Sequence, residues 1–224
     1  MKKVIVILIF IFAVVTPMAQ TVVSEQEKTA KPVLKTLLLY TGKEGNSSFY
    51  TIRYRDTKPD DVPQEVYDGL WEIQKEVIDN FTYDFDMLRG RKKSPYIYGA
   101  TKEDYYKYGG GVCNDYSNFF ILLAREKGLI ENLFKVSGKS SYGAHAWLEY
   151  RTAENVYIID PTWSDDYSYG NKQTQQKFKE SPAYGREYFF ITYAEDIIIC
   201  KAILQSYNHS TYTNRTEIRL SDME

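Results

Sequence analysis

Apolar side chains recur at helical spacing in two stretches of the chain, and the first stretch follows Pro63. Its members share one helix face: Val66, Leu70, Ile73, Val77, Ile78 and Phe81. Such a stripe predicts an amphipathic helix that packs against the core. Asp60 and Asp61 come just before the proline, and an acidic cap with a proline in the first turn predicts where this helix starts.

The second stripe predicts a helix from Asn114 to Lys127 that stops at Gly128. Its apolar members are Tyr116, Phe119, Phe120, Leu123 and Ala124. Cys113 therefore lies at the positive end of a helix dipole, a position that lowers thiol pKa values and raises the fraction of nucleophilic thiolate. Three glycines at 109–111 precede it and permit backbone approaches that a side chain would block. A small buried cysteine, or half of a disulfide, is the alternative interpretation.

Strand-like segments surround these helices. Residues 34–40 and 49–55 predict two strands joined by a turn-rich connection, as a hairpin at the domain edge or a small separate appendage. Residues 133–136 predict a short strand, and the Ser- and Gly-containing stretch 139–143 predicts a mobile loop. Residues 187–193 predict a further strand.

A long connection from Tyr83 to Tyr108 is rich in aromatic residues. It contains Tyr96, Tyr98, Tyr105, Tyr106 and Tyr108. Long connections of this kind form lids or cleft walls in many enzymes, although they also serve as plain surface packing. Tyr106 and Tyr108 are therefore candidates for substrate binding.

Two neighbouring strands could place a histidine beside a carboxylate. Residues 144–150 and 156–160 are strand-like, and a hairpin that pairs Tyr150 with Asn155 sets His145 opposite Asp160. Opposed residues share a sheet face with Cβ atoms roughly 5 Å apart, within hydrogen-bonding reach. The carboxylate would fix the imidazole tautomer, so that the other ring nitrogen could accept the thiol proton. The alternatives are a histidine without chemistry and an aspartate that only forms the turn before Pro161.

The amino terminus has the pattern of a secretory signal peptide. Lys2 and Lys3 precede an apolar run at 4–15, and the small residue Ala19 suggests cleavage after position 19. The run is short for a membrane span, and no later segment is long enough. No cysteine follows it, so a lipid-anchored protein is not expected. The chain is thus predicted to be secreted or periplasmic, without an integral membrane span after signal removal.

Charge and cysteine content narrow the classes of function. The 28 basic and 30 acidic residues nearly balance, which gives no indication of nucleic-acid binding. No acidic loop has metal-ligand spacing and histidines are few, so neither a metal nor a cofactor is expected. An exported chain with Cys113 and Cys200 also allows a disulfide, although one bridge would add little to a domain of this size. A buried Cys200 within the apolar element 197–204 is the preferred interpretation.

These features divide the chain into four parts. Residues 1–19 are the signal peptide, and 20–60 form a polar leader with the hairpin extension. Residues 61–204 form one α+β domain, and 205–224 form a polar tail with at most one edge strand.

The order of three motifs resembles the transglutaminase-like superfamily of papain-related thiol enzymes. The motifs are Gly111-Val112-Cys113 before a helix, His145-Ala146-Trp147 on a strand, and Asp160-Pro161-Thr162-Trp163 after the next strand. The resemblance covers approximately residues 63–200. It implies an α+β, papain-like core in which the cysteine helix packs on an antiparallel sheet that carries the histidine and aspartate.

The resemblance also implies roles for single residues. Cys113 would be the nucleophile, His145 the base and later the acid, and Asp160 the orienting carboxylate. The amide of Cys113 would be one oxyanion donor, with Tyr106 or Tyr108 conceivable as the second. Trp147 and Trp163 are further candidates for substrate contact.

We therefore expect an exported thiol enzyme that cleaves or transfers at peptide or carboxamide bonds through an acyl-cysteine intermediate. The resemblance favours hydrolysis over cross-linking, because the accessory modules of calcium-dependent cross-linking enzymes have no counterpart in the sequence. Its partner would be a peptide or protein substrate, with cell-wall peptide as one class. The alternatives are a catalytically inactive module that binds peptide or glycan, and a disulfide-stapled structural surface protein.

Overall fold

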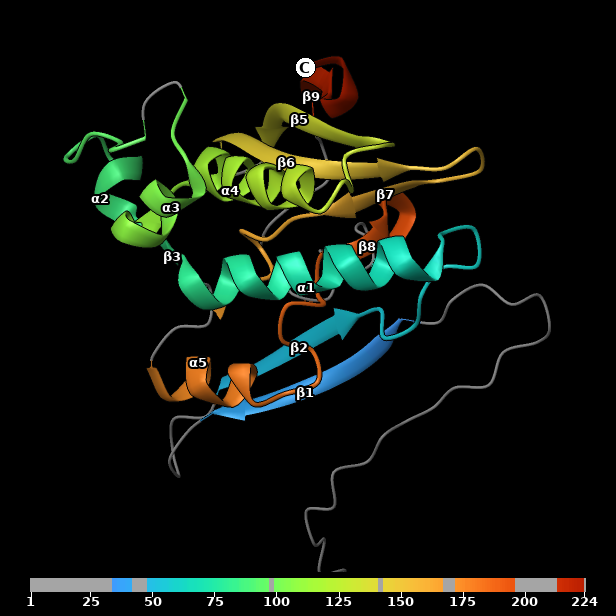
Figure 1. Cartoon of the computed structure of the whole chain (residues 1–224). Helices are drawn as coiled ribbons and strands as arrows, with labels where there is room; N and C mark the ends of the chain where they lie inside the picture. The colour runs from blue at the N-terminus through green and yellow to red at the C-terminus, as the bar shows by residue number, and fades with distance from the viewer. Residues whose placement is uncertain are drawn as a thin grey trace, which may run out of the picture.

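The computed structural model describes residues 34–41, 48–96, 99–140, 143–166, 172–195 and 213–223. Within these ranges the chain is a mixed α/β structure with antiparallel sheets, compatible with the expected α+β class (Figure 1). The predicted signal peptide and leader up to residue 33 and the apolar element 197–204 with Cys200 lie outside the described residues.

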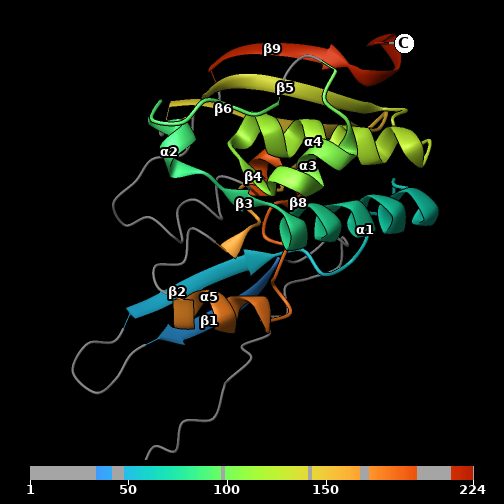
Figure 2. The same ribbon diagram turned by 60° about the vertical axis from the view of Figure 1, so that its left-hand side comes forward.

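The main sheet has five strands in the order β8-β7-β6-β5-β9, and each neighbouring pair is antiparallel. Its strands are β5 (Leu133–Ser140), β6 (Gly143–Arg151), β7 (Val156–Ile159), β8 (Phe189–Thr192) and β9 (Thr213–Arg219). Helix α4 (Cys113–Glu126) packs on β6, and α1 (Gln64–Asn80) packs on α4 (Figure 2). The apolar stripes predicted for both helices are buried in one core with the sheet, with two exceptions in α1. Val66 is half-buried against this core, and Ile78 is buried outside it.

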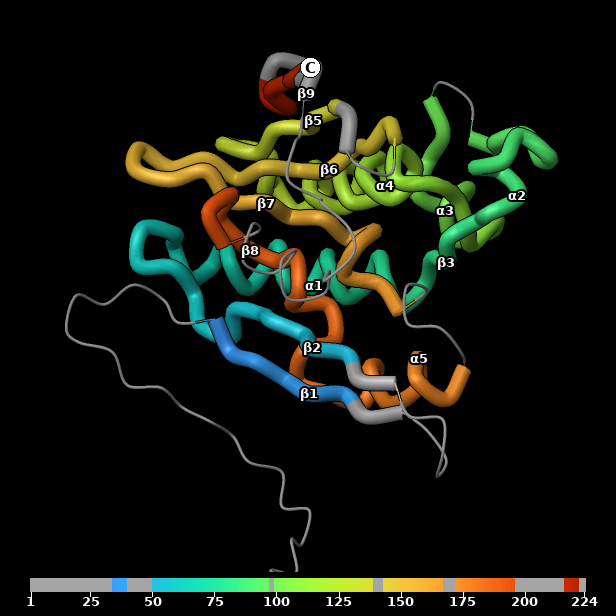
Figure 3. The backbone as a smooth tube through the Cα atoms, turned by 180° about the vertical axis from the view of Figure 1, so that it is seen from behind, coloured from blue at the N-terminus to red at the C-terminus, as the bar shows by residue number. Residues whose placement is uncertain are grey.

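The two predicted N-terminal strands are confirmed as β1 (Lys35–Thr41) and β2 (Ser48–Tyr54), which form their own antiparallel sheet. This hairpin lies on the opposite side of α1 from β9 (Figure 3). Its apolar residues Leu39, Ile52 and Tyr54 pack against Phe178 of α5 (Lys172–Lys179) and against Ala183. The hairpin is thus joined to a late segment of the chain by a small second core.

The predicted edge strand of the polar tail is present as β9, which pairs with β5. It leads into the 3₁₀ helix η2 (Leu220–Met223), and Leu220 is buried in the main core. No helix within the described ranges is both long and apolar enough to cross a membrane.

The start of α1 differs from the sequence prediction. The residue before the helix is Pro63, and no side chain caps its first turn. Asp61 instead accepts hydrogen bonds from Thr152 (2.6 Å), Asn155 (2.9 Å) and Tyr157 (2.5 Å). The carboxylate therefore ties the chain before α1 to the turn between β6 and β7, because three donors there outcompete the free amides of the helix start.

Two segments contain more regular structure than predicted. The connection at 83–108 includes α2 (Phe85–Leu88) and α3 (Lys102–Tyr108), and β3 (Thr82–Tyr83) pairs in parallel with β4 (Gly110–Gly111). Strand β5 continues through Ser140, so most of the predicted loop at 139–143 belongs to the β5 and β6 strands. Pairing across a hairpin compensates for the weak strand propensity of its serine and glycine residues.

The predicted register of the hairpin formed by β6 and β7 is wrong by two residues. Arg151 pairs with Val156 and Leu148 with Ile159, so the extrapolated partner of His145 is residue 162 and not Asp160. A shift of two residues keeps every side chain on its predicted face, whereas a shift of one would have reversed it. His145 and Asp160 therefore still share a face of the sheet.

Candidate functional site

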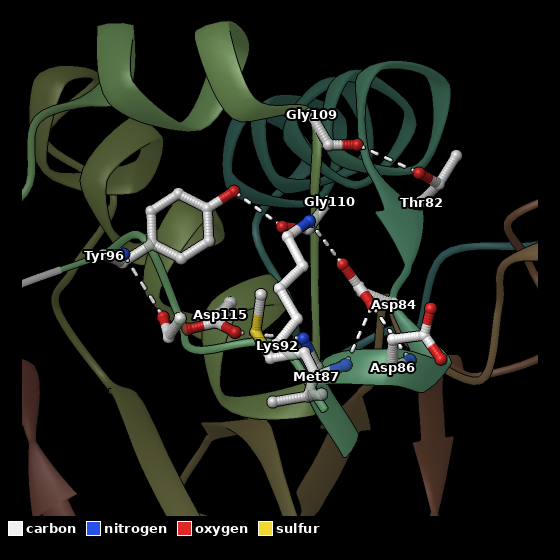
Figure 4. Close-up of polar contacts among 11 residues, drawn as sticks. Thr82, Asp84, Asp86, Met87, Lys92, Tyr96, Gly109, Gly110 and Asp115 are labelled. Carbon is white, nitrogen blue, oxygen red and sulfur yellow. Dashed lines mark hydrogen bonds and ion pairs between the residues drawn. The ribbon is translucent and has the colours of Figure 1, made fainter. Parts of the chain in front are cut away.

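The glycine segment before Cys113 is held closely between other elements (Figure 4). Gly109 ends α3 with φ +63°, and its carbonyl accepts a hydrogen bond from the Thr82 hydroxyl at 3.0 Å. The Tyr96 hydroxyl donates to the Gly110 carbonyl at 2.8 Å. A Cβ atom on Gly111 would lie 2.6 Å from the Asp115 side chain. The glycines are thus required by one left-handed φ angle and by close packing, as the sequence predicted.

Helix α4 begins at the cysteine itself. Asp115 accepts a hydrogen bond from the Val112 amide at 3.0 Å, which fixes the chain entering the helix. The Cys113 thiol is free and half-buried in the first turn. The first N–H groups of a helix have no intrahelical acceptor, so this position presents a thiol beside unpaired amide donors.

His145 and Asp160 meet as the sequence predicted. Nε2 of His145 lies 2.5 Å from Oδ2 of Asp160, and both side chains are buried. The Cys113 thiol lies close enough to the imidazole to help raise its pKa. Because Nε2 faces the carboxylate, Nδ1 is the ring nitrogen left for the thiol. The structure therefore places Cys113 beside the hydrogen-bonded pair of His145 and Asp160.

Asp160 has both of the roles considered for it. Its Oδ1 atom accepts from the backbone amides of Thr162 (3.0 Å) and Trp163 (3.2 Å), which stabilises the turn after β7. Its Oδ2 atom contacts His145. One oxygen thus holds the loop and fixes the direction in which the other oxygen faces the imidazole.

The charge state of His145 follows from its neighbours. Burial alone would lower the pKa of the imidazole, but the charge and hydrogen bond of Asp160, with smaller contributions from Cys113, raise this pKa to about 10. The imidazolium form is therefore favoured at neutral pH. An imidazolium beside a thiol supports the thiolate, which is the nucleophilic form.

Two tryptophans lie parallel to the His145 ring. The Trp163 ring stacks on it with centroids 4.3 Å apart and planes 7° apart, and Trp147 lies 5.9 Å away at 12°. Trp147 of β6 is fully buried and packs with Val136 and Ile158, so it supports the histidine and cannot contact a substrate directly. Trp163 is half-buried and remains a candidate for substrate contact. A stacked indole also stabilises a cationic imidazole ring.

Tyr106 and Tyr108 lie on α3 and are exposed. The Tyr106 hydroxyl bonds to Glu76 of α1, and its ring packs edge-on against Phe119. The Tyr108 ring packs against Tyr96. Their interactions are therefore with α1, α4 and the connecting loop, and the structure does not bring them to Cys113.

Tyr83 also lies in the site, although no sequence pattern indicates it. It pairs with Gly111, two residues before Cys113. Burial, followed by the charges of Cys113 and Asp160, raises the pKa of its phenol to about 12, so the hydroxyl keeps its proton at neutral pH. No sequence signal distinguishes this residue among 21 tyrosines, because a two-residue strand pair brings it to the cysteine.

A buried acid links α4 to the loop that follows Asp160. Asp165 is 2% exposed, bonds to the Tyr116 hydroxyl and accepts from the Asp166 amide at 2.6 Å. Burial, the largest cause, raises the pKa of its carboxyl to about 8. The native state therefore holds this side chain as a neutral acid at neutral pH.

Asp165→Asn should remove a pH dependence of stability. Because the folded pKa lies above the unfolded value of 3.8, the contribution of this acid is complete below about pH 4 and is lost as pH rises through about 8. Urea unfolding at pH 5, 7 and 9 measures the free energy of unfolding. Between pH 5 and pH 9 the wild type should lose on the order of a few kcal/mol of this free energy relative to the variant. The exposed Asp68→Asn change on α1 is the matched control, and equal slopes for all three proteins would contradict the assignment.

The site offers nucleophilic chemistry. In the described part of the chain, no three His, Cys, Asp or Glu side chains are grouped so that they could hold a metal ion. Acyl transfer through a thioester needs a thiol, an imidazole that can take and return a proton, and a carboxylate that orients the imidazole.

A search against protein-family models and a search against curated proteins each found no match to this chain.

Proposed function

We propose that this protein is an exported thiol enzyme of the transglutaminase-like type, acting on peptide or carboxamide bonds through an acyl-cysteine intermediate. The observation that carries the proposal is the grouping of Cys113 beside the hydrogen-bonded pair of His145 and Asp160. The packing of the cysteine helix on an antiparallel sheet supports a papain-like core. The N-terminal signal pattern supports export.

The first step is acylation of Cys113. The thiolate attacks the carbonyl carbon, the C–S bond forms, and the carbonyl electron pair moves onto oxygen. When the tetrahedral intermediate collapses, the C–N bond breaks and the imidazolium of His145 gives its proton to the departing amine. Asp160 keeps the imidazole in the tautomer that this transfer requires.

The second step resolves the thioester. His145, now neutral, takes a proton from the incoming nucleophile as that nucleophile attacks the thioester carbon. The C–S bond then breaks, the sulfur leaves as the thiolate and the proton stays on His145, which restores the ion pair. Water gives hydrolysis and an amine gives transamidation, and our proposal favours hydrolysis by resemblance alone.

The negative charge on the carbonyl oxygen needs donors. The backbone amide of Cys113 at the start of α4 is one candidate, and the phenol of Tyr83 is the second. Tyr83 suits this role because its hydroxyl stays protonated near the thiol.

Tyr83→Phe removes only that hydroxyl. Loss of one oxyanion donor typically lowers kcat about 10²–10³-fold, and we expect a fall in this range with little change in KM. Tyr108→Phe, on an exposed ring of α3, should leave kcat unchanged. If both variants turned over like the wild type, Tyr83 would not serve as the donor.

Mass spectrometry of the intact protein tests the function. The protein is incubated with a peptide library, with and without a primary amine, and adducts are mapped by proteolysis. A thioester on Cys113 that shortens in lifetime with added amine indicates transamidation, and one that decays equally without amine indicates hydrolysis. Binding of peptide or glycan without any adduct would favour the inactive-module alternative.

A further inference from the structure

Lys135 of β5 lies beside the start of α4. Its Nζ atom is 2.8 Å from Oδ1 of Asn114 and 2.5 Å from Oδ1 of Asn118. Asn114 directly follows Cys113, and Asn118 lies about one helical turn further on. The ammonium is thus held within one turn of the nucleophile by two amide oxygens.

The charge of Lys135 lacks a carboxylate partner within the described residues. The ion pairs in the described residues involve other lysines and arginines, and the hydrogen-bond partners of Lys135 are the neutral amides of Asn114 and Asn118. Burial, the largest influence, lowers the pKa of its ammonium, whereas the charges of Asp115 and Cys113 act to raise this pKa. Lysines are rarely fully buried unless they are paired, and groups with perturbed pKa values cluster at functional sites.

The geometry leaves this ammonium able to bind an anion. An ammonium has three N–H donors, and the two asparagines occupy two of them. The asparagine oxygens hold the Nζ atom in place without neutralising it. A carboxylate would supply the missing charge through a charge-assisted hydrogen bond.

We propose that Lys135, positioned by Asn114 and Asn118, binds a carboxylate of the substrate close to the scissile bond. This inference rests on the proposed function of Cys113 and deepens it. The substrate class is then an acidic peptide, with a side-chain or terminal carboxylate within about one residue of the bond that is cleaved. Lys135 binds that carboxylate and takes no part in proton transfer, which remains the role of His145.

Two alkylating probes test the proposal without knowledge of the substrate. Bromoacetylglycine and bromoacetylglycinamide react by the same step, in which the thiolate carbon–sulfur bond forms and bromide leaves. They differ only in a terminal carboxylate or carboxamide. The measured quantity is the ratio of their alkylation rates at Cys113, divided by the same ratio for 2-mercaptoethanol.

The wild type should favour the acid probe by on the order of tenfold, the effect of one charge-assisted hydrogen bond. Lys135→Gln should bring the normalised ratio close to one, and the ratio cancels any slowing of both probes that follows from the loss of a positive charge near Cys113. Lys127→Gln, the same charge change at the far end of α4, should keep the wild-type ratio. Thermal melting checks that each variant is folded.

Several results would overturn the proposal. A wild-type ratio equal to that of 2-mercaptoethanol excludes carboxylate binding, and this comparison stands even if Lys135→Gln does not fold. An equal slowing of both probes in Lys135→Gln means that Lys135 only stabilises the thiolate. Failure of the proposed function gives a different signature, because Cys113 would then react with both probes as slowly at mildly acidic pH as an ordinary thiol.

Discussion

Cys113→Ala is expected to abolish acyl-enzyme formation and turnover while leaving the fold intact. The proposed mechanism assigns the attack on the carbonyl carbon to the Cys113 sulfur, and alanine removes this atom without adding bulk to the first turn of α4. Loss of a catalytic nucleophile leaves only the residual effect of oxyanion donors and binding, so turnover should fall by about 10⁵-fold or more. Intact-protein mass spectrometry and circular dichroism measure the two parts of this prediction.

Cys200→Ala is the matched control. If Cys113 is the nucleophile, the Cys200 variant should still form the adduct at Cys113 and should count one thiol fewer under denaturing, non-reducing conditions. An adduct that persists in Cys113→Ala, or a wild type without any titratable thiol, would contradict the assignment. The second of these results would support a disulfide instead.

Asp160→Asn should reduce kcat strongly and KM little. Oδ1 can still accept from the Thr162 and Trp163 amides, so the turn after β7 is preserved. The new amide donates toward Nε2 of His145, which places the ring proton on Nδ1, the nitrogen that faces Cys113. This is the wrong tautomer for a base, and the corresponding change in a serine triad costs about 10⁴-fold in kcat.

The pH profile distinguishes this effect from a general loss of structure. Removing the carboxylate charge removes the main influence that raises the pKa of His145, which is about 10 in the wild type. The alkaline limb of the turnover profile should therefore move to lower pH in Asp160→Asn. Asp68→Asn, an exposed change on α1, should move neither kcat nor the limb. An Asp160→Asn enzyme with wild-type turnover would show that the carboxylate does not orient His145.

The sequence was sufficient to predict the elements that carry the three central residues. Helical spacing of apolar residues located α1 and α4 because these stripes face a single core. Strand alternation set His145 and Asp160 on the same face, and the two-residue error in register preserved that face. The contact itself depends on the turn held by Oδ1 of Asp160, which pairing arithmetic does not describe.

The remaining residues of the site depend on tertiary contacts. Tyr83 reaches the cysteine through a two-residue parallel pair with Gly111, too short for any periodic signal. Nothing in the sequence distinguishes Lys135 from an ordinary strand lysine, because only the packing of α4 brings Asn114 and Asn118 to its ammonium group. The aromatic connection before Cys113 indicates Tyr106 and Tyr108 as candidates, but in the structure α3 directs them toward Glu76 and Tyr96.

The central claim is that Cys113 and His145 form an ion pair, and the rate of iodoacetamide labelling at Cys113 as a function of pH tests it most directly. We predict that labelling stays fast well below the pH at which an ordinary thiol, with a pKa of about 8.5, stops reacting. Asp160→Asn should narrow the pH range in which Cys113 is labelled faster than an ordinary thiol, because the imidazolium of His145 then loses its proton at lower pH. A wild-type profile that simply follows that of a free thiol would contradict the ion pair and, with it, the proposed catalysis.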